Sequence, residues 1–306
     1  MSAHPQSEKA SALKPARNVL GLKKSKGKQK LSCLTCYDYT TALILDQAGV
    51  DILLVGDSLA MTVLGHPDTL RVTVDEMLHH TKAVVRGTKS AFVVADMPFL
   101  SYQVDLAEGI RNAGRFLQEG GAKAVKLEGV SPEILTLVHR LSEIGIPVMG
   151  HLGFTPQSVH QMGGFKVQAK SLEDAEQLIR DAQALERAGA FSIVLEMVPH
   201  ELATAITSIV SIPIIGIGAG NGCDGQVLVI DDVLGRYSQI SPRFVRRYMN
   251  GEELIQDAAE RYCEDIQSGR FPSNDTEAFA FPETLRPQLN DLIHRQGSEA
   301  LSFSGC

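Results

Sequence analysis

The chain has 306 residues, of which 44% are hydrophobic and 21% charged, and its formal net charge is −7. This length suits one large domain with its own core, because barrels of alternating strands and helices routinely reach it. No stretch approaches the ~20 consecutive apolar residues of a membrane span, which excludes an integral membrane protein.

The charge is distributed unevenly. Residues 1–30 contain eight Lys or Arg and one acid, which leaves 21 basic and 35 acidic residues, or −14, in residues 31–306. An acidic body argues against wrapping nucleic acid, which requires a basic face. We expect residues 1–30 to be a flexible, solvated leader; a nucleic-acid tail or an organellar address is the alternative. The leader has no apolar signal-peptide core, so a cytoplasmic location is expected.

Five cysteines are too few for a disulfide framework and suit a reducing compartment. Cys33 and Cys36 match a C-x-x-C pattern. Residues three apart on a strand point to opposite faces, so we expect no redox or zinc role for this pair.

Short runs rich in β-branched and aliphatic residues recur along the chain. Several are apolar nearly throughout, as expected of parallel strands covered on both faces. In chain order the expected strands are 31–37, 51–56, 91–95, 122–127, 146–150, 191–195, 212–217 and 226–230. Helical spacing is found at 39–49, 73–86, 105–119, 132–143, 171–188 and 199–210.

This alternation predicts an α/β fold, a (β/α)₈ TIM barrel. A doubly wound open sheet is the alternative architecture. We expect the catalytic barrel to span 31–270, with 242–267 as its long C-terminal helix. Residues 268–306 lack a clear pattern, and 271–306 are expected to be a poorly structured tail.

Three acids stand at the ends of expected strands, where such barrels place their chemistry. Asp57 and Asp96 follow the second and third strands, and Glu128 follows the fourth. Carboxylates converging on one mouth repel one another unless a cation neutralises them, and Mg²⁺ prefers oxygen ligands. The alternative is that each acid caps a helix or pairs with a base.

Lys126 and Glu128 are two residues apart on one strand, so both side chains face the barrel mouth while Val125 and Leu127 face the helices. Lys126 could hold a substrate carboxylate, form a Schiff base or pair with Glu128. Ser58 lies beside Asp57, but no Ser-His-Asp partner set is evident for it.

Glu196 ends a strongly apolar run. A partly desolvated carboxylate there suits a general base near neutral pH, although a capping or ion-paired Glu is the alternative. His151 is either a second proton-handling group or a hydrogen-bonded core histidine, and the second interpretation is favoured.

A glycine-rich run, 216–222, follows the seventh strand, and 220–225 satisfies G-x-G-x-x-G. The dinucleotide fingerprint requires a helix next, whereas a strand is expected at 226–230, so we reject it. Close backbone packing beside a ligand is the preferred interpretation, with phosphate binding as the alternative.

Eight segments at the strand ends resemble the ketopantoate hydroxymethyltransferase family, in the family's order, over residues 20–272. They are TCYDY at 35–39, VGDSL at 55–59, ADMPF at 95–99, VKLEG at 125–129, GHLGFTPQS at 150–158, GGFKVQ at 163–168, LEMVP at 195–199 and GIGAG at 216–220. Cys36, Ala60 and Arg71 depart from the family's usual Ala, Gly and Pro.

The resemblance implies a Mg²⁺-dependent barrel enzyme of the phosphoenolpyruvate/pyruvate superfamily. Its reaction would transfer a hydroxymethyl group from 5,10-methylenetetrahydrofolate to 3-methyl-2-oxobutanoate through a Mg-stabilised enolate. The product would be 2-dehydropantoate (ketopantoate), for pantothenate and coenzyme A synthesis. The implied partners are the keto acid and the folate, without nucleic acid or membrane, and further copies of the chain in a homo-oligomer, commonly a decamer.

The resemblance also implies roles for residues. Asp57 and Asp96 would bind the metal and through it the substrate, and Glu128 would complete the metal site directly or through water. Ser58 and Lys126 would hold the keto acid. Glu196 would be the general base, with His151 as a supporting group behind it.

Two other functions are compatible with a barrel. A lyase or mutase of the same superfamily usually needs a loop with a reactive Cys, and only Cys223 lies near a strand end here. A barrel without catalytic activity, serving as an assembly subunit, would be expected to have lost its strand-end acids.

Overall fold

The computed structural model describes residues 16–164, 166–236 and 242–302. The chain divides into two compact units, Met1–Met249 and Asn250–Cys306. In the first unit, eight strands form a closed barrel in the order β1 to β8, with every neighbouring pair parallel. The predicted (β/α)₈ barrel is therefore confirmed, and the open-sheet alternative is wrong.

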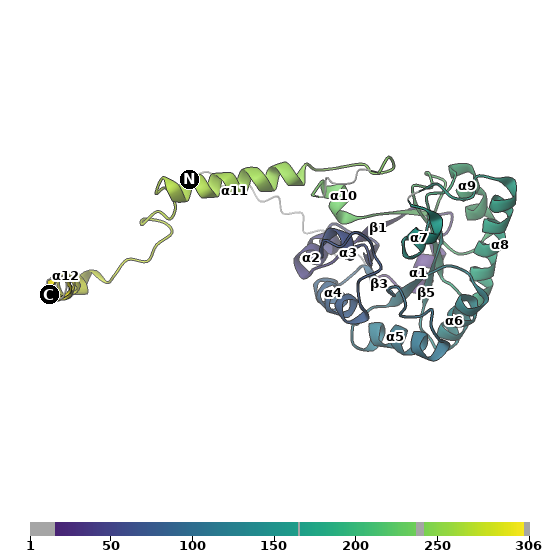
Figure 1. Cartoon of the computed structure of the whole chain (residues 1–306), viewed down its shortest axis with the longest axis horizontal. Coiled ribbons are helices and arrows are strands. Elements are labelled where there is room, and N and C mark those ends of the chain that lie inside the picture. The colour runs from purple at the N-terminus through teal and green to yellow at the C-terminus, as the bar shows by residue number, and fades with distance from the viewer. Residues whose placement is uncertain (1–15, 165, 237–241, 303–306) are drawn as a thin grey trace. The chain divides into compact units, whose positions relative to one another are not determined.

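The helices between consecutive strands surround the barrel (Figure 1). The strands are β1 Leu31–Thr35, β2 Ile52–Val55, β3 Phe92–Asp96, β4 Ala124–Glu128, β5 Val148–Gly153, β6 Ser192–Glu196, β7 Ile214–Ile217 and β8 Gly225–Leu228. The larger helices are α2 Tyr39–Gln47, α4 Val74–Gly87, α5 Leu106–Gln118, α6 Pro132–Glu143, α8 Leu172–Ala188 and α9 His200–Ile209. Shorter elements are α1 Val19–Lys24, α3 Leu59–Thr62, η1 Pro156–Ser158, α7 Val159–Met162 and α10 Ile230–Leu234.

Side chains at the strand-to-helix turns begin several of the outer helices. Asp38 accepts a hydrogen bond from the backbone N–H of Thr41 at the start of α2. Thr73 and Glu76 form a capping box that satisfies the first turn of α4. Thus Asp38, the acid that follows β1, caps a helix, as Asp residues at this position commonly do.

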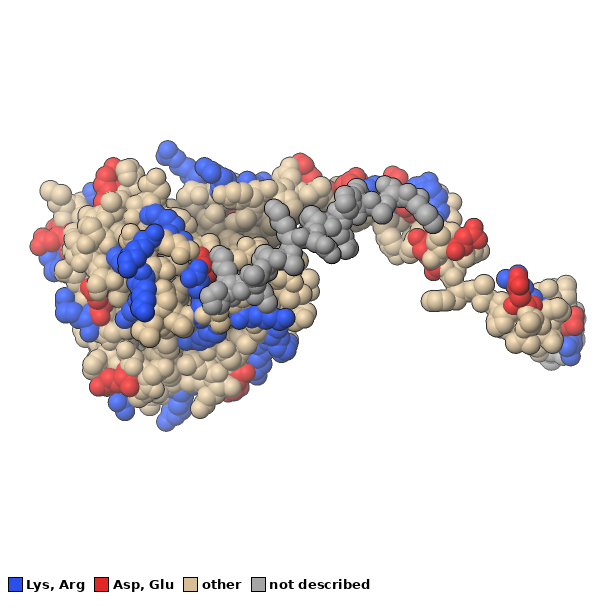
Figure 2. All heavy atoms as spheres, turned by 180° about the vertical axis from the view of Figure 1, so that it is seen from behind, with Lys and Arg blue, Asp and Glu red and all other residues tan. Residues whose placement is uncertain are grey.

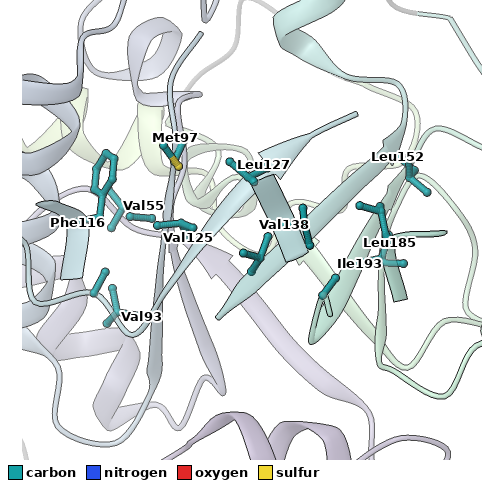
Figure 3. Close-up of a cluster of buried hydrophobic side chains, with 14 of the residues drawn as sticks. Val55, Val93, Met97, Phe116, Val125, Leu127, Val138, Leu152, Leu185 and Ile193 are labelled. Atoms are coloured by element: carbon teal, nitrogen blue, oxygen red, sulfur yellow. The ribbon is translucent and has the colours of Figure 1, made fainter. Parts of the chain in front are cut away.

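Alternation along the strands divides the apolar residues into two layers. Val125 and Leu127 of β4 face the helices, as predicted, and pack in a continuous layer with residues such as Val138 of α6 (Figure 3). Ala124 and Met149 belong instead to the cluster inside the barrel. The interior is thus apolar towards the amino-terminal ends of the strands, and the polar residues lie at their carboxyl ends.

The segment α1 closes the amino-terminal end of the barrel. Leu22 is buried in one cluster with Phe92 and Phe191, which stand at the starts of β3 and β6. Arg17 pairs with the buried Asp51, and Lys26 pairs with the buried Asp224 at 2.8 Å. These contacts fix the chain before β1.

The leader was expected to be flexible through residue 30, but residues 16–30 are folded. The physical reason is that Leu22 supplies an apolar contact within a lysine-rich segment, while Lys23 and Lys24 remain exposed. Basic side chains are visible on the face of the barrel unit in Figure 2, among uncharged and some acidic residues. Residues 1–15 of the expected leader lie outside the described residues.

The second unit differs from expectation in two ways. Its helix α11, Gly251–Gln267, begins nine residues later than predicted, because Asn250 and Gly251 interrupt the helical pattern. The expected unstructured tail contains η2 Glu283–Leu285 and helix α12 Arg286–Ser302. Within the described ranges, no helix has both the length and the apolar character that crossing a membrane demands.

The contact of α1 with the barrel can be tested through Leu22. We expect Leu22→Ala to lower the free energy of unfolding by about 2–5 kcal/mol, because it leaves a cavity at the base of the barrel. The control is Leu20→Ala on the same helix, where the side chain is 69% exposed. Urea unfolding should show a change within about 0.5 kcal/mol for that control. Equal effects of the two substitutions would contradict the packing described.

Candidate active site

The carboxyl ends of the strands bring the predicted residues together. Asp96 on β3 lies in register with Lys126 on β4, and Glu128 on β4 lies in register with His151 on β5. All four side chains are buried. Because residues two apart on a strand share a face, Lys126 and Glu128 both point into the barrel, above Ala124.

An ion pair joins two adjacent strands. The Lys126 ammonium donates to Asp96 Oδ1 at 2.8 Å, and the backbone N–H of Asp57 donates to Asp96 Oδ2 at 3.1 Å. Lys126 therefore pairs with Asp96 and not with Glu128, the partner considered from sequence. Burial opposes its charge, but the carboxylates of Asp96, Glu128 and Asp57 outweigh burial and raise the pKa of Lys126. A lysine that holds its proton so firmly is a poor Schiff-base nucleophile.

Gln157 is a site residue that the sequence reasoning missed. Its Nε2 donates to Asp57 Oδ2 at 2.9 Å, and its backbone N–H donates to Glu128 Oε2 at 3.0 Å. Residue 157 lies in the resembling segment 150–158, on the turn η1 beyond β5. Its position just beyond the carboxyl end of a barrel strand is the sequence feature that could have identified Gln157 as a site residue.

Burial and mutual repulsion perturb the acids. Burial, followed by the charges of Asp96 and Glu128, raises the pKa of Asp57 to about 8. Burial raises the pKa of Glu128 to about 7, although Lys126 works in the opposite direction. With all three acids ionised, Lys126 compensates only one of them. Two buried negative charges then lack a cation among the residues that the structure describes.

His151 connects two carboxyl groups. Its Nδ1 lies 3.1 Å from Glu128 Oε1, and its Nε2 lies 3.2 Å from Glu196 Oε2, the latter without the alignment of a hydrogen bond. Burial, together with the nearby charge of Lys126, lowers the pKa of His151. A neutral imidazole is therefore the form expected near pH 7. His151 is buried, and each of its ring nitrogens lies near a carboxyl oxygen.

The backbone around Glu196 is tightly constrained. Its side chain is 14% exposed, and it is the last residue of β6. The next residue, Met197, has a φ of +50°, which is unfavourable for a residue with a side chain. A Cβ on Gly153 would lie 2.2 Å from the carbonyl oxygen of Glu196, so only glycine fits beside it. Such constraints are common at functional sites.

Ser58 stands at the edge of the same site. Its hydroxyl lies 2.8 Å from the hydroxyl of Tyr37, and either group can be the donor. Burial raises the pKa of Tyr37, so the phenol keeps its proton. Ser58 therefore presents a neutral hydroxyl next to Asp57, held by a second neutral hydroxyl.

The glycine-rich run after β7 has a packing role. A Cβ on Gly220 would lie 2.3 Å from His200 Cβ, and one on Gly222 would lie 2.0 Å from the Thr204 hydroxyl. Both neighbours belong to α9, so the glycines allow close approach to that helix. Strand β8 follows directly, consistent with rejecting a dinucleotide fingerprint.

The groups at this site that could bind a metal ion are carboxylate oxygens, which suit Mg²⁺. Among the residues that the structure describes, no three His, Cys, Asp or Glu side chains form a complete metal-binding cluster. Mg²⁺ does not require one, because it usually keeps several waters and binds one or two carboxylates. Asp57 and Asp96 fit such an ion, because Lys126 compensates only one of the three charges of Asp57, Asp96 and Glu128.

Several solved structures share the fold of this chain at low sequence identity. A phosphonopyruvate hydrolase, crystallised with oxalate and Mg²⁺, has a TM-score of 0.55 at 13% identity, over 93% of this chain and 96% of its own. A 2,3-dimethylmalate lyase of the PEP mutase/isocitrate lyase superfamily has a TM-score of 0.53 at 16% identity, over 92% and 98%. These likenesses show that the fold of this chain is shared by barrel enzymes of low sequence identity.

Relatives that share the sequence of this chain indicate its family more specifically than the fold does. Residues 17–274 match the pattern of the family described as ketopantoate hydroxymethyltransferase. The 3-methyl-2-oxobutanoate hydroxymethyltransferase of Syntrophomonas wolfei is 55% identical over 87% of this chain and 96% of its own. The enzyme of that name from Syntrophus aciditrophicus is 56% identical over 84% and 93%. The chain belongs to the ketopantoate hydroxymethyltransferase family, a family of transferases.

The buried charge predicts a gain in stability from Asp57→Asn without metal. An acid whose pKa is raised on folding binds its proton more tightly in the folded state. The protein therefore loses stability as the pH rises from about 4 towards about 8. In EDTA we expect Asp57→Asn to raise the melting temperature at pH 8, and to raise it less at pH 5.

The matched control is Asp291→Asn, an exposed position on α12, which should change neither melting temperature. A lower melting temperature for Asp57→Asn at both pH values would show that Asp57 is stably ionised and paired, contrary to the electrostatics above.

Proposed function

We propose that this chain transfers a hydroxymethyl group from 5,10-methylenetetrahydrofolate to 3-methyl-2-oxobutanoate, forming 2-dehydropantoate (ketopantoate). The family membership and the names of the relatives support this reaction. The observation that carries the chemistry is the arrangement of one ammonium, three buried carboxyl groups and the partly exposed Glu196 at one end of the barrel.

Asp57 and Asp96 are the residues that would hold Mg²⁺, with Glu128 completing the site directly or through water. The bound ion would act as a Lewis acid that polarises the keto oxygen of the substrate. Gln157 and Lys126 hold these carboxylates in place before any substrate arrives.

Lys126 and Ser58 would hold the keto acid. The ammonium of Lys126, fixed by Asp96, provides positive charge where the keto oxygen becomes negative. The Ser58 hydroxyl, supported by Tyr37, can donate a hydrogen bond to the substrate carboxylate. Both groups are positioned beforehand, so little reorganisation is needed during the reaction.

Glu196 would remove the proton from C3 of the keto acid, a role worth about 10²–10⁴ in rate. The electron pair of the broken C–H bond forms the enolate. Water adds to the methylene carbon of the folate, both C–N bonds to that carbon break, and tetrahydrofolate leaves with a proton on each nitrogen, which frees the one-carbon unit at the oxidation level of formaldehyde. C3 of the enolate then bonds to that carbon, and the carbonyl oxygen takes the proton held by Glu196 to become the hydroxyl group of the product. His151, a neutral group whose Nε2 lies 3.2 Å from Glu196 Oε2, would act as a supporting group behind the base.

The lyase or mutase alternative has less support. It calls for a reactive thiol at the carboxyl end of the barrel, but Cys223 is buried. Burial raises the pKa of its thiol, which favours the unreactive protonated form.

Proton exchange at C3 tests the proposal without the folate. The protein with 3-methyl-2-oxobutanoate in D₂O should remove the C3 proton signal, followed by NMR, only when Mg²⁺ is added. Absence of Mg²⁺-dependent exchange would contradict the enolisation.

Glu196→Gln tests the base. We expect it to lower the exchange rate at least about 100-fold, because the amide cannot accept the proton, while melting temperatures with Mg²⁺ rise as in the wild type. Glu176→Gln, on the outer surface of α8 and 73% exposed, is the matched control and should exchange normally. Retained exchange in Glu196→Gln would remove Glu196 from this role.

A homo-oligomer, with the decamer as the expected count, is also part of the proposal. Ile255, Tyr262 and Ile266 of α11 form one apolar helix face, and all three are exposed. On the barrel, the outward-facing residues Ser32 of β1 and Gln226 of β8 are exposed as well. The apolar face of α11 is of the kind that association between copies covers.

Sedimentation velocity tests this association. The wild type should sediment as a multiple of the chain, and the double change Ile255→Lys with Ile266→Lys should shift it to smaller species. Glu264→Gln, on the opposite side of α11, should leave the distribution unchanged. A monomeric wild type at micromolar concentration would contradict the expectation.

A further inference from the structure

Gln157 makes more hydrogen bonds to the site than any single predicted residue. Its side chain is 7% exposed, and its Nε2 donates both to Asp57 Oδ2 at 2.9 Å and to the carbonyl oxygen of Met97 at 3.0 Å. Its backbone N–H reaches Glu128 Oε2. One residue on the β5 side of the barrel therefore contacts the segments that follow β2 and β3 and the end of β4.

The oxygen of the Gln157 side-chain amide also has two hydrogen-bond partners. Gln157 Oε1 accepts from the Tyr102 hydroxyl at 2.8 Å and from Gln103 Nε2 at 3.1 Å. The Tyr102 oxygen in turn accepts from the backbone N–H of Glu128 at 3.1 Å. Both N–H groups and both acceptor positions of the Gln157 amide are thus used.

This pattern fixes the orientation of the amide. A flipped Gln157 would set its NH₂ against the Gln103 donor and its oxygen against the oxygens of Asp57 and Met97. Only one orientation satisfies all the neighbours, and it points the donor at Asp57. Tyr102, which is buried, is the residue that anchors the other end.

The N–H groups of Gln157 are uncharged, which suits a site that would bind a cation. Lys126 holds Asp96 and compensates its charge. Gln157 holds Asp57 and Glu128 through neutral N–H groups, so it fixes an oxygen of each without cancelling the negative charge that a divalent ion requires.

We propose that Gln157 is a positioning residue for the divalent cation: it sets the orientation of the Asp57 and Glu128 carboxyl groups, and Tyr102 sets its amide. This inference rests on the proposed function, in which these acids form the metal site. Partners behind metal ligands typically change affinity or activity by about 10- to 100-fold when they are lost.

Binding of Mn²⁺ alone tests the inference, because Mn²⁺ accepts the same oxygen ligands as Mg²⁺ and its free form is read by EPR. Gln157→Leu keeps the approximate size but removes all side-chain hydrogen bonds. We expect its Mn²⁺ affinity to fall about 10- to 100-fold. In the exchange assay, the Mg²⁺ concentration for half-maximal rate should rise more than the saturated rate falls. Gln118→Leu, exposed at the end of α5, is the matched control.

Tyr102→Phe provides a second test if Gln157→Leu does not fold. It removes one anchor of the amide, and we expect a smaller loss of Mn²⁺ affinity in the same direction. Wild-type Mn²⁺ affinity in either folded variant, with only a lower melting temperature, would overturn the positioning role while leaving the proposed function intact. A wild-type protein that binds no Mn²⁺ would instead overturn the proposed metal site, and the inference with it.

Discussion

Buried negative charge at the carboxyl end of the barrel is the constraint on which the rest of the site depends. Within the part of the chain that the structure describes, Asp57, Asp96 and Glu128 have one compensating ammonium, that of Lys126. Removing carboxylates from water is costly, and the cost appears here as the raised pKa values of Asp57 and Glu128. An arrangement that weakens the metal-free protein in this way is expected where function requires it.

The barrel tolerates this charge because its stability comes from elsewhere. Alternation along each strand sends one set of side chains to the helices and the other set inside, and the inner set is apolar towards the amino-terminal end. Leu22 of α1 closes that end. The polar residues are confined to the opposite end, where they need only be held in position, by Gln157, His151 and the backbone of Asp57.

Much of this arrangement could be predicted from sequence, for identifiable reasons. The period of two along β4 placed Lys126 and Glu128 on the inner face, and the apolar runs that end in Asp96 and Glu196 marked the strand ends.

The features that could not be predicted from sequence depend on contacts between distant segments. The lysine-rich composition of the leader gave no indication that Leu22 would be buried. The spacing of residues along the chain could not show that Lys126 on β4 would pair with Asp96 on the adjacent strand β3. Gln157 carries no charge and lies on a turn beyond its strand, so no periodic pattern marked it.

The site holds buried carboxyl groups whose negative charge a divalent cation would neutralise. Calorimetric titration with Mg²⁺ and the keto acid at pH 7, in buffers of different ionisation enthalpy, measures the protons released on binding. Because the pKa values of Asp57 and Glu128 are raised to about 8 and about 7, binding should release about one proton per ion. A binding heat that does not depend on the buffer would mean that no proton is released, which would contradict the claim.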